Sequence, residues 1–417
     1  MRSFVEIPPE SHFSIQNLPF GIFSGPNSEQ PRVGVAIGDF VLDLALIEDY
    51  GFFTGPRLKG RKLFSQPVLN PFMAQGRPAW REARQTIQHI LGSDNPLLRD
   101  DVSLRKKALI PMADVKMYLP AVVGDYTDFY SSREHATNVG AMFRGPEKAL
   151  QPNWLHLPVA YHGRASSIVP SGTDIRRPLG QIVEPGASQP SLVPSREMDF
   201  ELEIGQFVGP GNGLGQPITI DEAADHIFGL VLVNDWSARD IQRWEYRPLG
   251  PFLSKNLATS ISPWVVTLDA LEPFRCPGPE QDPEPLPYLR SAGNWAYDIH
   301  LEVQLQSIAQ NNPATVSHSN ARYLYWNMCQ QVAHHTIAGC NLRPGDLLAT
   351  GTISGPTPDS AGSMLELSWR GERPLQLPGN ETRTFLKDGD TVTMTGWCQG
   401  DGFRVGFGEL TGRIAGE

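Results

Sequence analysis

The sequence predicts a mainly β protein with some α-helix, arranged in two domains. The chain has 417 residues, and its 40 glycines and 37 prolines favour turns and strands over long helices. A chain of this length usually divides between two hydrophobic cores. Several segments alternate apolar and polar side chains, the period of two that is typical of half-buried strands. A link at residues 108–120, with prolines at both ends of its stretch 111–120, divides the chain into domains 1–118 and 119–417.

The first domain is predicted to combine a hairpin with a helix. Residues 33–44 alternate around Gly38, which predicts two strands joined by a tight turn. Residues 78–91 carry apolar side chains at helical spacing, and Gly92 suits the helix end. No group of potentially catalytic residues occurs here, so this part of the chain is interpreted as a structural or assembly domain.

The second domain is predicted to hold most of the strands. The expected strands are 230–233, 264–268, 299–306, 364–369, 392–395 and 402–409, and the expected helices are 221–228, 239–246 and 320–339. The proline-rich stretch 273–288 is expected to be an exposed loop.

Charge and composition exclude several classes of protein. The net charge of −10 disfavours partners such as nucleic acids or anionic membranes. No apolar run is long enough to span a bilayer. The four cysteines form no Cys-x-x-Cys pair, which argues against a zinc site and suits a reducing compartment. These features predict a cytoplasmic protein.

An unusual acidic strand is predicted at residues 195–205. Asp199, Glu201 and Glu203 alternate with apolar residues, so the three carboxylates share one face of the strand. One interpretation is an ordinary solvated face. The other is a cation site in which Glu201 and Glu203 direct oxygen ligands toward one metal ion. The sequence pattern alone leaves both open, and Asp199 is the residue best explained by a solvated face.

Other polar groups occur near predicted turns and strand ends. In the segment 124–140, Asp128 and His135 would lie two turns apart on one face if the segment were helical. Histidine suits general-base chemistry, although single histidines are often structural. Asp235 ends a buried strand, and Arg239, Gln242 and Tyr246 would share a face of the following helix. An ordinary polar helix face explains these three equally well.

The motifs together resemble the fumarylacetoacetate hydrolase family over nearly the whole chain. The resemblance rests on these blocks: Asp125-Tyr-Thr-Asp-Phe-Tyr-Ser-Ser-Arg-Glu-His-Ala-Thr-Asn-Val-Gly140, Tyr161-His-Gly-Arg-Ala-Ser-Ser167, Met198-Asp-Phe-Glu-Leu-Glu203, Val233-Asn-Asp-Trp-Ser-Ala-Arg-Asp-Ile-Gln242, Gly351-Thr-Ile-Ser-Gly355 and Ser363-Met-Leu-Glu-Leu367. The resemblance implies an N-terminal SH3-like barrel and a C-terminal mixed β-roll in a homodimer. It also implies hydrolysis of the C–C bond of 4-fumarylacetoacetate, a diketo acid, in the last step of tyrosine and phenylalanine catabolism.

The resemblance also implies roles for individual residues. The implied calcium ligands are Asp128, Glu201, Glu203 and Asp235, and the implied base is His135, oriented by Glu366. The implied substrate contacts are Tyr130, Arg144, Tyr161, Gln242, Tyr246 and Thr352. Arg239, Gln242 and Lys255 are implied to stabilise developing charge. A second ion, Mg²⁺, is implied at Lys255 and Thr259, although Ala258 stands where the family often has glycine.

Elementary chemistry agrees with a hard cation at the first site. Four carboxylates without a thiolate favour Ca²⁺ or Mg²⁺ over zinc. Two alternatives remain at the level of the sequence. One keeps the site but changes the substrate, as in an acylpyruvate-type hydrolase or a decarboxylase of the same superfamily. The other is a non-catalytic, metal-stabilised binding or assembly protein, which would have no need of a paired base such as His135–Glu366.

Overall fold

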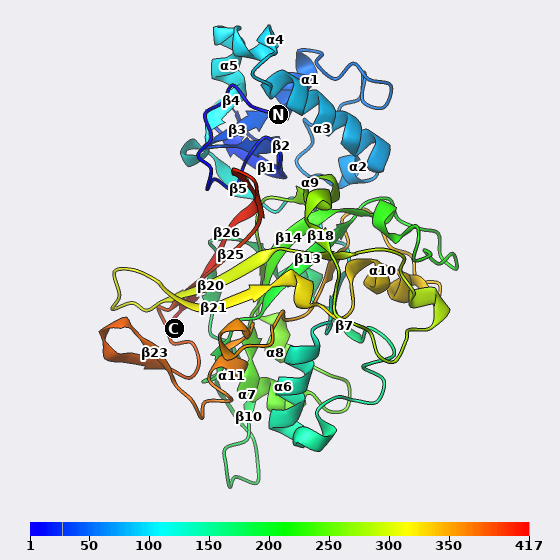
Figure 1. Cartoon of the computed structure of the whole chain (residues 1–417). Coiled ribbons are helices and arrows are strands. Elements are labelled where there is room, and N and C mark those ends of the chain that lie inside the picture. Colours follow the sequence, from blue (N-terminus) through cyan, green and yellow to red (C-terminus); the bar gives the residue numbers. More distant parts are fainter. Residues whose placement is uncertain (27, 417) are drawn as a thin grey trace.

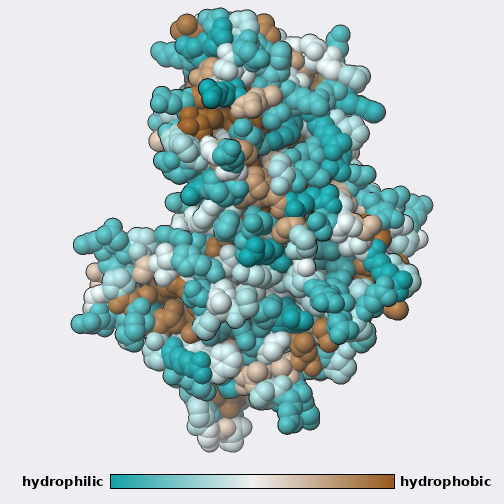
Figure 2. Space-filling model, in the orientation of Figure 1, coloured by the Kyte–Doolittle hydropathy of each residue, from teal (hydrophilic) through white to brown (hydrophobic). Residues whose placement is uncertain are grey.

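The computed structural model describes residues 1–26 and 28–416, and it confirms the predicted fold class. Figure 1 shows the N-terminal residues as a separate body at the top and the remaining chain as a larger body below it. The strand β26 (Phe403–Ala415) belongs to the larger body, and one end of it reaches up to the N-terminal body. The face drawn in Figure 2 is largely hydrophilic, with hydrophobic residues in separate small patches.

The N-terminal body is an antiparallel sheet flanked by helices. The strand order is β4-β3-β2-β1-β5, with bounds β1 Phe20–Gly25, β2 Ser28–Ile37, β3 Phe40–Asp43, β4 Leu109–Pro111 and β5 Lys116–Tyr118. The helices are α1 Leu44–Asp49, α2 Asn70–Met73, α3 Arg77–Leu91, α4 Pro96–Arg99 and α5 Val102–Ala108. The predicted hairpin at 33–44 and helix at 78–91 are confirmed. The residues predicted as a link, 108–120, instead supply both edge strands of this sheet.

Aromatic packing joins the two bodies. Phe20 of β1 exchanges main-chain hydrogen bonds with Val265, at 3.0 and 2.7 Å. The rings of Phe72 and Trp80 pack edge-on against Phe228, with centroids 5.7 and 5.1 Å apart. Because Phe228 belongs to β14, the N-terminal body supports the outer end of the strand that leads into the site.

The larger body is built around a central mixed sheet. Its strand order is β7-β6-β22-β13-β14-β16-β8, and β17 also pairs with β14. The bounds are β6 Tyr126–Phe129, β7 Ala160–Gly163, β8 Ile168–Pro170, β13 Leu202–Val208, β14 Ile227–Asp235, β16 Thr259–Ile261, β17 Val266–Thr267 and β22 Leu347–Ala349. β6 and β22 run parallel, so their carboxyl ends lie at the same edge of the sheet.

A second sheet packs against the central one. Its order is β21-β20-β25-β26-β9, with bounds β9 Asp174–Arg176, β20 His300–Gln306, β21 Ala314–Asn320 and β25 Thr391–Gly400. Leu232 of β14, Leu301 of β20 and Phe407 of β26 belong to the shared core. The short strand pairs are β10 Leu179–Ile182 with β11 Ser191–Pro194, β12 Met198–Asp199 with β15 Ser237–Ala238, β18 Arg275–Cys276 with β19 Ala296–Tyr297, and β23 Leu375–Leu377 with β24 Glu381–Arg383.

The helices of the larger body lie beside the sheets and differ from several predictions. They are α6 Arg133–Arg144, α7 Arg239–Glu245, α8 Leu253–Asn256, α9 Leu268–Leu271, α10 Met328–Thr336 and α11 Met364–Leu367. The helix predicted at 320–339 is shorter because Asn327 caps it, while Asn320 ends β21 and Ala321–Tyr323 form a separate 3₁₀ turn. The helix predicted at 221–228 is a single 3₁₀ turn, Ala223–His226. None of the helices described is both long enough and apolar enough to cross a membrane.

Candidate metal centre and active site

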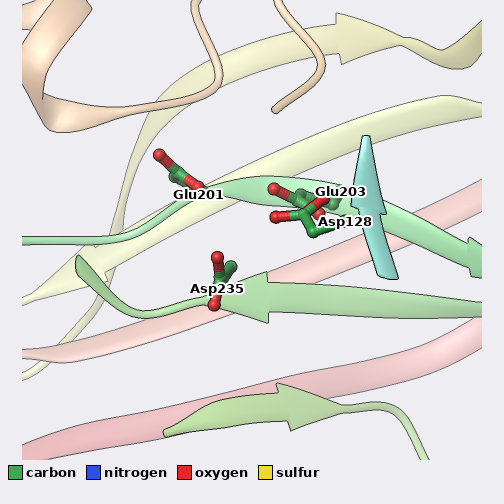
Figure 3. A group of neighbouring side chains, drawn as sticks. All are labelled: Asp128, Glu201, Glu203 and Asp235. Carbon is green, nitrogen blue, oxygen red and sulfur yellow. The ribbon is translucent and has the colours of Figure 1, made fainter. Parts of the chain in front are cut away.

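The segment predicted as one acidic strand, 195–205, is divided in the structure between β12 and β13, and it carries two of four carboxylates that meet in the central sheet. Glu203 lies in β13, and Glu201 immediately precedes it. Antiparallel pairing of β13 with β14 brings Asp235 beside Glu201, whose carbonyl accepts the Asp235 N–H at 3.3 Å. Parallel pairing of β6 with β22 places Asp128 at the same edge. One oxygen from each of the four side chains lies within 4.8 Å of the others, and Figure 3 shows Asp235 pointing from β14 toward β13.

The burial of these carboxylates fits a divalent cation. Asp128, Glu201, Glu203 and Asp235 are at most 5% exposed. Oδ1 of Asp128 and both Oε atoms of Glu203 accept no hydrogen bond from any described residue. An unpaired buried carboxylate is costly, whereas oxygen ligands of this kind suit a hard cation. Burial, together with the repulsion between the carboxylates, raises the pKa values of Asp128 and Glu203 well above their ordinary range in the metal-free chain.

Protein cations compensate the other two carboxylates. The Lys255 ammonium donates to Asp235 Oδ2 at 2.7 Å and to Glu201 Oε2. Burial alone would raise the pKa of Glu201, but the charges of Lys255 and Arg239 outweigh it and lower the value to about 2. Thr259 Oγ1 donates to Asp235 Oδ1 at 2.8 Å. An ammonium has no lone pair to offer, so a second cation at Lys255 and Thr259 would need ligands other than the lysine side chain.

His135 and Glu366 form a buried pair, and His135 lies in helix α6, as the sequence pattern allowed. Asp128 ends strand β6, and Ser132 then caps α6, so Asp128 and His135 do not share a helix. Glu366 is buried and belongs to helix α11, although residues 364–369 were predicted as a strand. His135 Nδ1 lies 2.6 Å from Glu366 Oε2. Burial would raise the pKa of Glu366, but the charge and hydrogen bonds of its neighbours, foremost His135, lower it.

Three residues that hold Glu366 were not predicted. Asn138 Nδ2 donates to Oε1 at 2.9 Å, while the hydroxyls of Ser354 and Ser363 donate to Oε2 at 2.9 and 2.8 Å. The sequence contains a signal for two of them. Asn138 follows His135 by three residues and therefore shares its helix face. Ser363 precedes Glu366 by three residues, which is the spacing of a helix-capping pair and predicts a helix start in place of a strand.

A cavity of about 330 Å³ joins the metal group to the base. Its lining includes these predicted site residues: Asp128, Tyr130, His135, Arg144, Tyr161, Glu201, Glu203, Arg239, Gln242, Tyr246, Lys255 and Thr352. Asp235, Glu366 and Thr259 do not line it. Asp235 is hydrogen-bonded to Lys255 and Glu366 to His135, and both of these partners line the cavity. Thr259 donates to Asp235. Val139, Phe143 and Leu365 form an apolar part of the wall that the sequence had not suggested.

Regular elements place several of the residues that line the cavity. Arg144 ends α6, and Tyr161 lies in β7. The Arg144 guanidinium donates to the Ala149 carbonyl at 2.5 Å and stays exposed at the edge of the cavity. The predicted common face of α7 is observed, since Arg239 Nη1 donates to Gln242 Oε1 at 3.0 Å.

A strand-rich fold with a four-carboxylate group beside a buried histidine–glutamate pair defines a candidate metal-dependent hydrolase. Comparison with known families is specific. A family model described as "Fumarylacetoacetate (FAA) hydrolase C-terminal" matches residues 125–415, and one described as "Fumarylacetoacetase N-terminal" matches residues 16–120. The chain therefore belongs to the fumarylacetoacetate hydrolase family.

Individual relatives match over almost the whole chain. A fumarylacetoacetase of Arabidopsis thaliana is 59% identical over 414 residues, covering 99% of this chain and 98% of the relative. A fumarylacetoacetase of Homo sapiens is 57% identical over 413 residues, with the same coverage. Among solved structures, a fumarylacetoacetate hydrolase of Exiguobacterium antarcticum is 16% identical with a TM-score of 0.52, covering 96% of this chain and 100% of that one. This last similarity concerns the fold alone.

Proposed function

We propose that the chain hydrolyses the C–C bond of 4-fumarylacetoacetate to fumarate and acetoacetate, the last step of tyrosine and phenylalanine catabolism. Relatives that are 57% and 59% identical carry the name of this activity. The observation that carries the proposal is the His135–Glu366 pair, whose histidine lines the same cavity as Asp128, Glu201 and Glu203 of the metal group. A scaffold protein would need the carboxylates for stability but not the paired base.

The four carboxylates of Asp128, Glu201, Glu203 and Asp235 are proposed to hold the cation, and family resemblance favours Ca²⁺ there. When bound, a divalent cation supplies Lewis-acid polarisation of the diketone oxygens. The lysine at 255 and the arginine at 239 offset part of the negative charge that an anionic substrate would otherwise meet. A second, magnesium ion near Lys255 and Thr259 is proposed from the family resemblance only.

His135 is proposed to activate water. A carboxylate only accepts hydrogen bonds, so its bond to Glu366 places the ring proton on Nδ1 and leaves Nε2 as the acceptor. His135 lines the cavity, where Nε2 can take a proton from water as the water oxygen attacks the ketone carbon of the fumaryl group, which becomes the new carboxylate of fumarate. The Glu366 carboxylate then stabilises the imidazolium that forms.

The leaving group is proposed to be stabilised by Arg239, Gln242 and Lys255. When the C–C bond breaks, its electron pair passes to the acetoacetate fragment as an enolate. The proton held on His135 returns to the carbon of that enolate, which completes the two products. Nη2 of Arg239 is buried and lies 2.7 Å from Glu201 Oε1, yet it has no well-oriented hydrogen-bond partner among the described residues. A donor in this state is suited to developing negative charge.

The remaining predicted contacts are proposed to position the substrate. Burial raises the pKa values of the Tyr130 and Tyr161 hydroxyls, so both remain protonated donors. Arg144 at the edge of the cavity suits a terminal carboxylate of the substrate. Tyr246 and Thr352 complete the polar lining.

Two further properties belong to the same proposal. We expect a homodimer from the family resemblance and a cytoplasmic location from the cysteine pattern and the lack of a long apolar run. Sedimentation equilibrium of the purified chain tests the first, and fractionation of the source cells tests the second.

The test of the proposed function is a direct assay. Metal-loaded protein should consume the diketo absorbance of 4-fumarylacetoacetate and release fumarate and acetoacetate in equal amounts. His135→Ala should lower kcat by about 10²- to 10⁴-fold, the usual contribution of a general base. His334→Ala is the matched control, because His334 is a hydrogen-bonded helix residue outside the cavity. Near-normal turnover of His135→Ala would refute the mechanism, and turnover only of other acylpyruvates in a substrate panel would refute the substrate.

A further inference from the structure

Asp199 lies in β12, within the segment 195–205 that was predicted as one acidic strand, but it has neither of the settings considered for it. Its side chain is fully buried, so it does not belong to a solvated face. It also stands outside the group of carboxylates that meet at the metal site. Its two oxygens are instead fully used by protein donors from two different elements. The Met364 N–H donates to Oδ1 at 2.6 Å, whereas the Leu365 N–H and Arg239 Nε donate to Oδ2 at 3.1 and 2.7 Å.

One set of these bonds fixes the short helix that carries Glu366. Helix α11 spans only Met364–Leu367, and the first N–H groups of a helix have no partner within it. Asp199 accepts the first two of them. A helix of four residues has little stability of its own. These bonds and the Ser363 cap therefore fix the backbone position from which the Glu366 side chain extends to His135.

The remaining bond fixes the guanidinium of Arg239. Asp199 takes Nε, Gln242 takes Nη1 at 3.0 Å, and Glu201 lies beside Nη2. These contacts act on a planar fork whose three nitrogens move together. The bond to Nε therefore fixes the orientation of Nη2, the donor without a well-oriented partner, and Arg239 lines the cavity.

We infer that Asp199 is a positioning residue that sets two halves of the site relative to one another: Glu366, which orients the base, and Arg239, which faces the leaving group. A carboxylate is needed because all three partners donate, and an amide accepts on only one of its atoms. The inference rests on the proposed function, since it assigns Asp199 to that reaction.

The test compares Asp199→Asn with Asp43→Asn. Asp43 is the matched control because it is also buried, accepts from an arginine Nε (Arg32, 2.8 Å) and caps a helix start (Leu46 N–H, 3.1 Å), but lies in the N-terminal sheet. We expect Asp199→Asn to lower kcat by about 10- to 100-fold with a much smaller change in KM, as for partners that orient reacting groups. Asp43→Asn should lower the melting temperature while kcat and KM stay near the wild-type values.

A double-mutant cycle with Glu366→Gln separates positioning from general damage. If Asp199 acts through Glu366, the loss of kcat in the double variant will be smaller than the product of the two single losses. Asp199→Asn already displaces the Glu366 carboxylate, so Glu366→Gln then has less to remove. Fully multiplicative losses, wild-type kcat in Asp199→Asn, or an equal loss of kcat in Asp43→Asn would each overturn the inference. If Asp199→Asn does not fold, Asp199→Glu keeps the charge and shifts the oxygens, and a wild-type kcat for that variant would likewise overturn it. A wild-type enzyme without turnover would refute the proposed function instead.

Discussion

Replacing Glu366 by glutamine tests the origin of the basicity at His135. Four donors converge on this carboxylate, from His135, Asn138, Ser354 and Ser363, at 2.6 to 2.9 Å. Glutamine has the same shape, but one of its two end atoms is a donor. The substitution therefore changes charge and hydrogen-bond direction while it leaves the packing intact.

The expected loss follows from the two ways in which the amide can be placed. With its nitrogen toward His135, the histidine must accept at Nδ1 and so carries its proton on Nε2, where it cannot take one from water. General-base catalysis is then lost, a reduction of about 10²- to 10⁴-fold in kcat. With its nitrogen toward Asn138, the asparagine amide can turn and the tautomer survives. Only the charge assistance is lost, about 1 to 1.5 kcal/mol or roughly tenfold.

The assay is the decay of the diketo absorbance at saturating metal and substrate, with the melting temperature measured in parallel. Glu82→Gln is the matched control, because Glu82 accepts two main-chain N–H groups, of Arg57 and Leu58, in the N-terminal body. It should leave kcat unchanged. A kcat for Glu366→Gln within about threefold of wild type would contradict both placements, since each costs at least roughly tenfold.

The metal group yields two further predictions. Burial and mutual repulsion raise the pKa values of Asp128 and Glu203. In the metal-free protein the protonated forms of these groups therefore stabilise the fold, and this stabilisation is lost as the pH rises through their folded pKa values. The gain in melting temperature on adding Ca²⁺ to chelated protein should therefore grow from about pH 5 to about pH 8, and a gain independent of pH would contradict the assignment. Glu203→Gln should leave the chelated protein at least as stable as wild type and reduce the Ca²⁺-dependent gain. Glu201→Gln should lower the unfolding free energy of the chelated protein by about 3 to 5 kcal/mol, because it breaks buried pairs with Lys255 and Arg239. Urea unfolding measures both, and equal effects of the two substitutions would contradict this distinction.

Local signals account for the parts of the fold that the sequence predicted. The hairpin around Gly38 and the helix α3 each depend on a turn residue or on periodicity within one short segment. The predictions failed where tertiary pairing decides. Residues 109–118 were predicted to belong to a link because of Pro111 and Pro120, yet they form sheet edges through pairing with β1 and β3, which lie far away in the sequence.

The site divides along the same line. The common face of Arg239 and Gln242 follows from helical spacing and is observed. The closeness of Asp128 to Glu203 could not come from spacing, because it depends on β22 pairing with both β6 and β13. Asp128 was assigned to the metal site from the family motif. Such a motif identifies a carboxylate without showing which strands bring it to the site.

The acidic strand shows why residue pattern and burial must be considered together. In an ordinary amphipathic strand, the face that carries the charged side chains is exposed to solvent. Here Asp199, Glu201 and Glu203 are all at most 5% exposed, and each is compensated differently. Asp199 is satisfied by main-chain N–H groups and Arg239, and Glu201 by Lys255 and Arg239, whereas Glu203 receives no hydrogen bond from the described residues. Burying an ion costs several kcal/mol, so a carboxylate without a protein partner is retained at the expense of metal-free stability. The segment thus combines Asp199, which holds α11 and Arg239, with Glu201, which pairs with protein cations, and Glu203, whose ionised form requires the metal cation.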